Sequence, residues 1–260
     1  MTSPALESHL RERRDAGRKL LVPYVTGGLG VDWCEVVRAF GAAGADAIEI
    51  GLPFSDPVMD GPTIQEASQR ALDGGANPMA ILAALADVDA GVPLVAMTYY
   101  NLVFRAGHER FASTLVANGV LGAIVPDVPL EELDPWQTVA DAAGVATVLL
   151  ASPVTPDDRL ARIADRSRGF VYGVGLMGVT GERERVATTA AIVAKRLKAV
   201  TDKPVVIGFG ISTPAQAAEL CADADGVVVA SALMRRMMDG ASVAELGDIV
   251  GSFREALDRG

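Results

Sequence analysis

Short apolar runs rich in β-branched residues alternate with longer amphipathic or alanine-rich segments along the whole chain. Each run has the length of a strand, and continuous apolarity is typical of parallel strands that helices cover on both faces. The pattern predicts eight strands, at residues 20–26, 47–50, 93–99, 122–125, 147–150, 169–174, 204–207 and 226–230.

The segments between these strands have the length and periodicity of helices. They predict helices at residues 32–43, 63–72, 109–117, 131–143, 156–167, 188–200 and 214–221. Three additions are also predicted: a helix at 5–17, a short one at 79–85 after the second strand, and a short one that opens at Ser231 after the eighth, ahead of a last helix at 241–257.

Strands that alternate with helices of about 10–15 residues indicate parallel βαβ units. Eight such units fill the chain, which favours the α/β class and a single (β/α)8 TIM barrel, with one domain over residues 1–260. An open doubly wound sheet is the alternative, because periodicity alone does not separate the two. The turn at residues 26–30 lacks the full G-x-G-x-x-G spacing of dinucleotide-binding sheets, and this favours the barrel.

Composition narrows the class of protein. Of the 260 residues, 50% are hydrophobic and 22% are charged, so a disordered or fibrous chain is excluded. The net charge of −10 provides no basic stripe for nucleic acid, which argues against such a partner. A small phosphorylated ligand is compatible with this charge, because backbone N–H groups can hold a phosphate.

The cysteines and histidines are few and scattered. Cys34 and Cys221 are too far apart for a disulfide framework, and with only His9 and His108 besides, we expect no metal site. The N-terminus lacks the apolar core of a signal peptide, and two aspartates interrupt the most apolar stretch, at 76–97, too early for a membrane span. We therefore expect a cytoplasmic protein that does not enter a membrane.

The second predicted strand carries one acidic residue, Glu49. Side chains alternate across a strand, so Ile48 and Ile50 would pack against helices while Glu49 points into the barrel, near the strand end where TIM barrels hold their active sites. Apolar neighbours would raise its pKa toward a value useful for proton transfer. The alternative is a structural ion pair with a buried Lys or Arg.

The loop that follows, residues 52–63, is long for a strand-to-helix connection and rich in turn-forming residues. Its carboxylates, Asp56 and Asp60, lie within reach of the Glu49 rim. Asp60 on the same βα unit is a catalytic candidate, although negative charge near a helix start is also structurally favourable. Asp56 sits in a Ser-Asp-Pro turn, where a structural role is the strong alternative.

Glycine-rich turns follow the later strands, at residues 178–181 and 208–210, and the eighth strand leads into the short helix at Ser231. Many barrels place a phosphate at a helix N-terminus in this region. The pattern therefore indicates an anion site, with ordinary turns that need positive φ as the alternative.

The run at 48–65 closely resembles the signature of the tryptophan synthase α subunits, and the resemblance extends over nearly the whole chain. Supporting stretches lie at 23–26, 100–104, 127–129, 178–181 and 208–212. The resemblance implies retro-aldol cleavage of indole-3-glycerol phosphate to indole and glyceraldehyde 3-phosphate, by a carbon–carbon lyase that carries no cofactor. It also implies an alpha2beta2 heterotetramer whose β subunit contains pyridoxal phosphate (PLP) and makes L-tryptophan.

The resemblance also implies roles for individual residues. Glu49 would be the general acid and base, and Asp60 would accept a hydrogen bond from the indole N–H. The other implied residues form four groups: an indole pocket of Tyr24, Met97, Ile124, Tyr172 and Phe209; a phosphate site of Gly181, Gly210, Ala230 and Ser231; a lid with Thr180 and Arg183; and a partner loop with Pro53 and Asp56.

Three positions depart from the family pattern. Met59 stands where a small residue is common, Leu176 lies in a stretch that is Ser-Arg-Ser in several relatives, and Ala230 replaces a frequent glycine. Since Ala230 keeps its backbone N–H, we expect phosphate binding to persist. Two other functions stay open: a catalytically weak subunit that activates the β subunit, and another phosphosugar-binding barrel enzyme.

Overall fold

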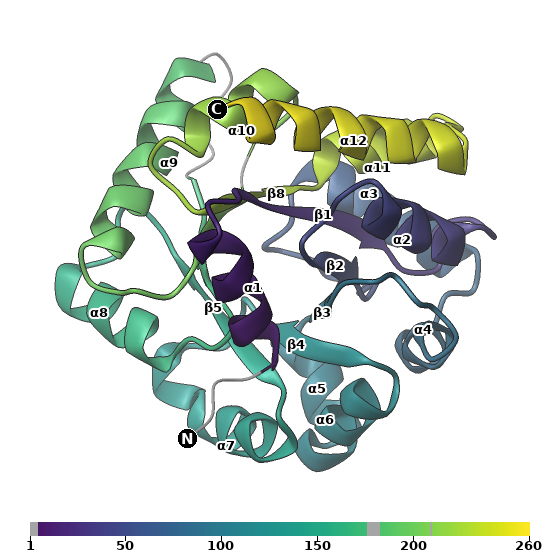
Figure 1. Ribbon diagram of the computed structural model, residues 1–260. Helices are drawn as coiled ribbons and strands as arrows, with labels where there is room; N and C mark the ends of the chain where they lie inside the picture. The colour runs from purple at the N-terminus through teal and green to yellow at the C-terminus, as the bar shows by residue number, and fades with distance from the viewer. Residues whose placement is uncertain (1–4, 176–182, 209) are drawn as a thin grey trace.

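Eight parallel strands form a closed barrel in the order β1 to β8, with β1 hydrogen-bonded to both β2 and β8 (Figure 1). The structure is a computed structural model that describes residues 5–175, 183–208 and 210–260, without the side chains of 183–188. Closure confirms the barrel and overturns the open-sheet alternative. The strands are β1 (Leu20–Thr26), β2 (Ile48–Gly51), β3 (Leu94–Met97), β4 (Val120–Ile124), β5 (Ala146–Ala151), β6 (Val171–Gly173), β7 (Val205–Ile207) and β8 (Gly226–Val229).

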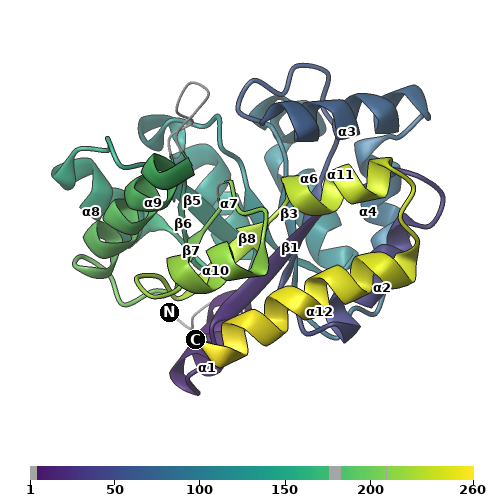
Figure 2. The same ribbon diagram turned by 90° about the horizontal axis from the view of Figure 1, so that it is seen from above.

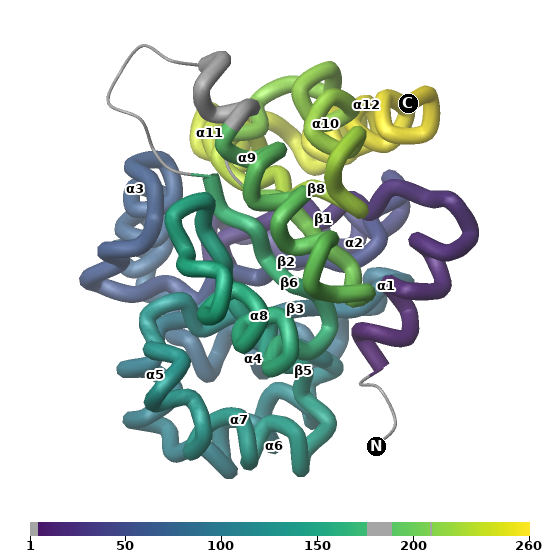
Figure 3. The backbone as a smooth tube through the Cα atoms, turned by 90° about the vertical axis from the view of Figure 1, so that its left-hand side faces the viewer, coloured from purple at the N-terminus to yellow at the C-terminus, as the bar shows by residue number. Residues whose placement is uncertain are grey.

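Helices surround the barrel, as the views in Figures 2 and 3 show. They are α1 (Ala5–Asp15), α2 (Trp33–Ala42), α3 (Pro62–Asp73), α4 (Pro78–Leu85), α5 (Tyr100–Ala106), α6 (His108–Ala117), the 3-10 turn η1 (Leu130–Glu132), α7 (Asp134–Ala143), α8 (Asp157–Arg166), α9 (Arg183–Lys198), α10 (Pro214–Leu220), α11 (Ser231–Met238) and α12 (Val243–Arg259). In the described ranges no helix has the length and hydropathy of a membrane span.

The three predicted additions are present as α1, α4 and α11, but other boundaries were wrong. The helix predicted at 131–143 is divided into η1 and α7, because Pro135 lacks an amide N–H and is tolerated only in a first helical turn. Helix α5 was missed. It is only seven residues long and is followed by Gly107, whose φ of 84° interrupts the helical path before α6.

The strand residues alternate between two apolar layers. Ile48 and Ile50 belong to the layer between strands and outer helices, whereas Ala47 belongs to the barrel interior, together with Val22 and Val95. This alternation confirms the predicted orientation of β2. By the same period of two, Glu49 and Ala47 share the interior face.

Helix α1 closes the end of the barrel at which the strands begin (Figure 1). Leu6 and Leu10 join the interior cluster, and Gly122 leaves room for Leu6, since a Cβ there would lie 2.8 Å from its Cδ2 atom. Glu7 fixes the helix by accepting a hydrogen bond from the Gly169 N–H at 3.2 Å. Helix α1 therefore fills the end of the barrel at which the strands begin, which leaves the opposite end for a functional site.

Candidate active site

A cavity of about 470 Å³ occupies the end of the barrel at which the strands finish. Its walls come from the ends of several strands, from the loop between β2 and α3, and from the start of α11. It brings together nine of the residues singled out from the sequence: Tyr24, Glu49, Asp60, Met97, Ile124, Tyr172, Gly210, Ala230 and Ser231. Separate stretches of the sequence thus converge on one space, as the barrel topology requires.

Glu49 lies on the cavity wall and is only 4% exposed. Its Oε2 atom has no hydrogen-bond partner among the described residues, and none of their cations forms an ion pair with it. Burial, with a further contribution from the negative charge of Asp60, raises the pKa of Glu49 to about 8. Within the described part of the chain, this excludes the structural ion pair considered as the alternative.

Asp60 faces the same cavity from the β2–α3 loop. Partial burial raises the pKa of Asp60 to about 6, and hydrogen bonding with the Tyr99 hydroxyl lowers it and so limits the rise. The two carboxyl groups therefore differ in charge at neutral pH: Glu49 holds its proton and Asp60 is ionised. Such a separation of two neighbouring carboxyl pKa values is typical of acid–base sites.

Tyr99 holds the loop that carries Asp60. Its hydroxyl accepts a hydrogen bond from the Met59 N–H at 3.1 Å, and its ring stacks on Phe54 with centroids 5.1 Å apart. Gln65 adds a second attachment, because its Nε2 donates to the Asp60 carbonyl at 2.9 Å. We missed Tyr99 in the sequence, although its position at the end of the predicted third strand is one where barrel enzymes place functional groups.

Two tyrosines of the cavity wall fit against glycines of neighbouring strand ends. A Cβ at Gly51 would overlap the Tyr24 hydroxyl, and one at Gly208 would overlap the Tyr172 hydroxyl. Burial and the charges of Glu49 and Asp60 raise the pKa of both tyrosines, so they stay neutral. The wall around the carboxylates is thus aromatic and uncharged.

The far side of the cavity is suited to an anion. Helix α11 begins at Ser231, directly after Ala230, so its first N–H groups have no partner within the helix. Gly210, with a φ of 66°, and Ser212 line the same region. The helix N-terminus, the serines and the glycine turn provide donors without a lysine.

Several expected site residues lie elsewhere. Phe209, Thr180, Gly181 and Leu176 fall outside the described residues, and Arg183 begins α9 although its side chain is outside the description. Pro53 is buried, whereas Asp56 is exposed and accepts a hydrogen bond from the Ser55 hydroxyl. Further residues that line the cavity, and that the sequence pattern did not single out, include Thr63, Leu150, Val174 and Ser212.

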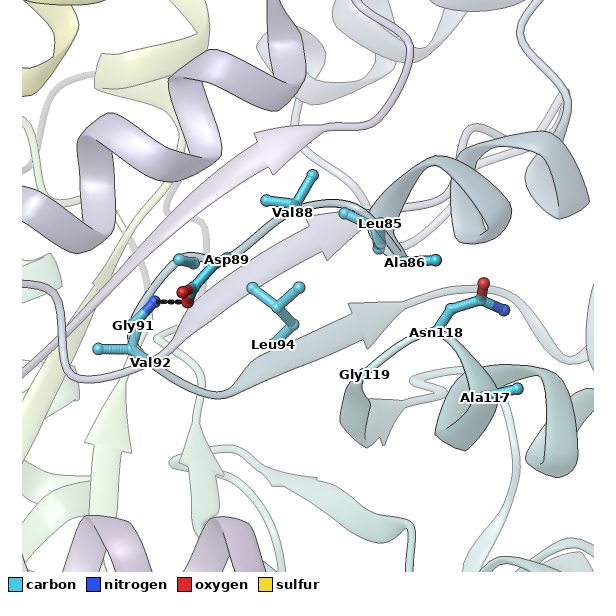
Figure 4. A pocket seen from close by; sticks show the side chains of 11 residues that line it. Leu85, Ala86, Val88, Asp89, Gly91, Val92, Leu94, Ala117, Asn118 and Gly119 are labelled. Atoms are coloured by element: carbon cyan, nitrogen blue, oxygen red, sulfur yellow. Dashed lines mark hydrogen bonds between the residues drawn. The ribbon is translucent and has the colours of Figure 1, made fainter.

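A smaller hollow of about 260 Å³ lies beside the start of β3, at the opposite end of the barrel (Figure 4). Asp89 is the only charged residue among those that line it, and its carboxylate accepts a hydrogen bond from the Gly91 N–H at 2.9 Å. Nowhere in the described ranges do three or more His, Cys, Asp or Glu side chains gather as a metal site would need. Among the described residues, this smaller hollow therefore adds no group of catalytic side chains to those of the cavity with Glu49 and Asp60.

Comparisons with known proteins agree with this geometry. A family model described as "Tryptophan synthase alpha chain" matches residues 10–249. The tryptophan synthase alpha chain of Thermobifida fusca is 42% identical over 261 residues, covering 98% of this chain and 97% of that one, and the Methanosarcina mazei protein is 43% identical over 245 residues, covering 93% and 90%.

Solved structures give the same result. A structure of Mycobacterium tuberculosis tryptophan synthase superposes with a TM-score of 0.90 at 37% identity, covering 98% of this chain and 99% of that one. The tryptophan synthase alpha chain of Legionella pneumophila superposes with a TM-score of 0.88 at 29% identity, covering 99% and 98%. Since the family model and the relatives match nearly the whole sequence, the chain belongs to the tryptophan synthase alpha chain family.

Proposed function

We propose that Glu49 and Asp60 carry out the retro-aldol cleavage of indole-3-glycerol phosphate to indole and glyceraldehyde 3-phosphate. The observation that supports this most is the buried Glu49 carboxyl group, which lies on the cavity wall without a hydrogen-bond partner at Oε2 among the described residues. With a pKa of about 8 it is protonated at neutral pH and can serve as an acid.

The proposed reaction returns Glu49 to its starting state. Its proton moves to C3 of the indole ring, and the bond from C3 to the glycerol chain then breaks with its electron pair returning to the ring. The glycerol hydroxyl on the departing carbon becomes the aldehyde, and its proton returns to the Glu49 carboxylate. One residue thus acts first as general acid and then as general base.

Asp60 stabilises the intermediate in this scheme. Protonation of C3 places positive charge on the ring nitrogen, and an ionised carboxylate that accepts a hydrogen bond from that N–H lowers the energy of the charge. The pKa of about 6 leaves Asp60 ionised at neutral pH. Tyr24, Met97 and Ile124 supply the apolar walls for the indole, while Gly210 and the start of α11 receive the phosphate.

A product assay tests this function. We expect the full chain, without added metal or cofactor, to release indole and glyceraldehyde 3-phosphate in equal amounts from indole-3-glycerol phosphate. Stimulation of the β subunit without any indole release would favour the regulatory alternative. Isomerisation of a phosphosugar without indole release would favour the other class of barrel enzyme.

The partner in this proposal is the tryptophan synthase β subunit, which holds the PLP, in an alpha2beta2 assembly. Large apolar side chains are exposed on the loops and the short helix that directly follow strand ends at the open side of the barrel, among them Val31, Val58, Met59, Phe104 and Val154. Phe104 is 67% exposed and Val58 is 79% exposed. Exposed apolar groups around one opening are typical of a protein-binding face, and Asp56 lies on the same loop as Val58.

Replacing Phe104 with Asp is expected to weaken assembly with the β subunit about 10-fold or more, since a charge would replace a large apolar contact. Titration of the β subunit by analytical ultracentrifugation measures the change. Val116→Asp is the matched control, because this 44% exposed residue lies on α6 beside the hollow at the opposite end. Equal weakening by both variants would contradict the placement of the partner.

Removing the Tyr99 hydroxyl with Tyr99→Phe is expected to lower kcat at pH 7 about 10-fold, the effect of one hydrogen bond to a charged group. The loss also takes away the contact that lowers the pKa of Asp60, so the acid limb of activity should move to higher pH. Tyr100→Phe is the control, since its hydroxyl lies 3.1 Å from His108 Nε2 instead. Equal activity of Tyr99→Phe and wild type would remove Tyr99 from the positioning of Asp60.

The proposal also includes the cellular setting and the extent of the unit. We infer a cytoplasmic protein that folds as one domain over residues 1–260. Free thiols at Cys34 and Cys221 are consistent with a reducing compartment.

A further inference from the structure

Helices α3 and α11 lie side by side at the open end of the barrel (Figures 1 and 2). Helix α3 begins two residues after Asp60, and α11 begins at Ser231, on the phosphate side of the cavity. The contact between these two helices therefore connects the Asp60 side of the cavity with its phosphate side.

Charged side chains connect the two helices. Arg235 donates from one nitrogen to the Glu66 carboxylate at 3.0 Å and from the other to the Thr63 hydroxyl at 3.2 Å. One turn further along α3, Arg70 donates to Glu66 at 2.7 Å and to the Met238 carbonyl at 3.2 Å. We call these five residues the α3–α11 clasp.

The clasp is continuous with both ends of the site. Arg235 lies one turn after Ser231 on the same face of α11, because residues four apart lie above one another on a helix. On the other helix, Thr63 lines the cavity, and Gln65 holds the Asp60 carbonyl. The bonded path from the phosphate side to Asp60 therefore runs through Arg235 and the first turn of α3.

The loop before α3 needs such support. Its tip, from Ser55 to Met59, is mostly exposed, so few contacts besides the Tyr99 hydroxyl at the Met59 N–H fix the backbone that precedes Asp60. Misplacement by about 1 Å of a group that stabilises a transition state can cost a large part of its effect. Binding energy from a remote phosphate can be used to hold such a group in place.

We propose that Arg235 is a positioning residue through which the phosphate-binding helix α11 holds the loop that carries Asp60. The inference rests on the proposed function, since it assigns the phosphate of the substrate to the start of α11. A direct attraction between Arg235 and the phosphate would not need Glu66. The proposed positioning role requires both residues.

Steady-state kinetics on indole-3-glycerol phosphate separates these two roles. If the clasp positions Asp60, Glu66→Gln and Arg235→Gln should each lower kcat about 3- to 5-fold and change KM less than about 2-fold. The double variant should show no further loss of kcat. The matched control is Glu35→Gln on α2, which breaks an exposed Arg–Glu pair of 2.6 Å away from the site and should leave kcat unchanged. If Glu66→Gln lowers KM while Arg235→Gln raises it at constant kcat, Arg235 acts on the phosphate directly and the proposal is wrong.

A binding experiment tests the clasp without turnover. Glycerol 3-phosphate, added to the isotope-labelled full chain, should shift the amide resonances of Ser231 and also those of Asp60 and Gly61. In Glu66→Gln the Ser231 shift should persist while the Asp60 and Gly61 shifts fall at least about 3-fold. Unchanged loop shifts in that variant, or no shift at Ser231 in the wild type, would overturn the proposal.

The two experiments distinguish a failure of the clasp from a failure of the proposed function. Indole release by the wild type together with intact loop shifts in Glu66→Gln would overturn the clasp alone. A wild type that releases no indole but shows the expected shifts would overturn the proposed reaction and leave the coupling between α11 and the loop.

Discussion

Glu49→Gln is expected to lower kcat for indole-3-glycerol phosphate cleavage by about 10³-fold or more, near the upper range for the loss of a general acid. The amide has almost the same shape as the protonated acid, but it cannot deliver a proton to C3 or take one from the glycerol hydroxyl. Substrate affinity should change little, because the phosphate and the indole ring contact other groups. Single-turnover indole release and equilibrium binding measure the two effects.

The stability of Glu49→Gln provides the control for folding. In the folded chain Glu49 keeps its proton to about pH 8, whereas in the unfolded chain it loses it near its ordinary pKa of 4.5. The folded state therefore binds more protons between these values, so this group makes the free energy of unfolding fall as pH rises from 4.5 to 8. Glutamine does not titrate, so the variant lacks this fall in the free energy of unfolding. It should therefore be at least as stable as the wild type at pH 8. Full turnover by such a folded variant would exclude Glu49 from proton transfer.

Asp60→Asn is expected to lower kcat by about 10²- to 10³-fold, which is the usual effect of removing one preorganised group that stabilises transition-state charge. The amide lacks the negative charge that opposes the positive charge on the indole nitrogen. Some activity should persist, because Glu49 can still protonate C3. Asp73→Asn, at the far end of α3, is the control for loss of a carboxylate, since Asp73 bonds only Gln69 among the described contacts.

Comparison of the wild type and Asp60→Asn on a substrate analogue tests the role assigned to Asp60. An analogue whose ring nitrogen is methylated has no N–H that could donate a hydrogen bond to Asp60. The difference between wild type and Asp60→Asn should shrink on that analogue, because the hydrogen bond is absent in both. A difference of the same size on both substrates would place the effect of Asp60 outside the N–H contact.

The pattern of the sequence favoured the barrel over an open sheet and predicted the direction of Glu49. Both depend on local rules: strands and helices alternate, and the period of two along β2 assigns Ile48 and Ile50 to one face and Glu49 to the other. Most of the other strand-end residues around the cavity were expected from the resemblance to the family, and the barrel brings them together because equivalent ends of parallel strands meet at one edge.

Contacts between distant parts of the chain could not be predicted in this way. Tyr99 reaches Met59 across 40 positions, and Arg235 reaches Glu66 across 169. The need for glycine at position 51 depends on the ring of Tyr24 in the neighbouring strand. None of these contacts produces a periodic pattern in the sequence, because each depends on how the loops and helices meet around the barrel.

The alkaline limb of the pH–rate profile tests the central claim most directly. The acid limb is shared with the substrate, because a phosphate monoester has a second pKa of about 6, close to that of Asp60. Above pH 7 the buried Glu49 is the proposed titrating acid. We predict that kcat/KM is constant near pH 7 and falls about tenfold per pH unit above about pH 8, as Glu49 loses its proton. A rate that stays constant to about pH 10 would contradict a Glu49 proton donor.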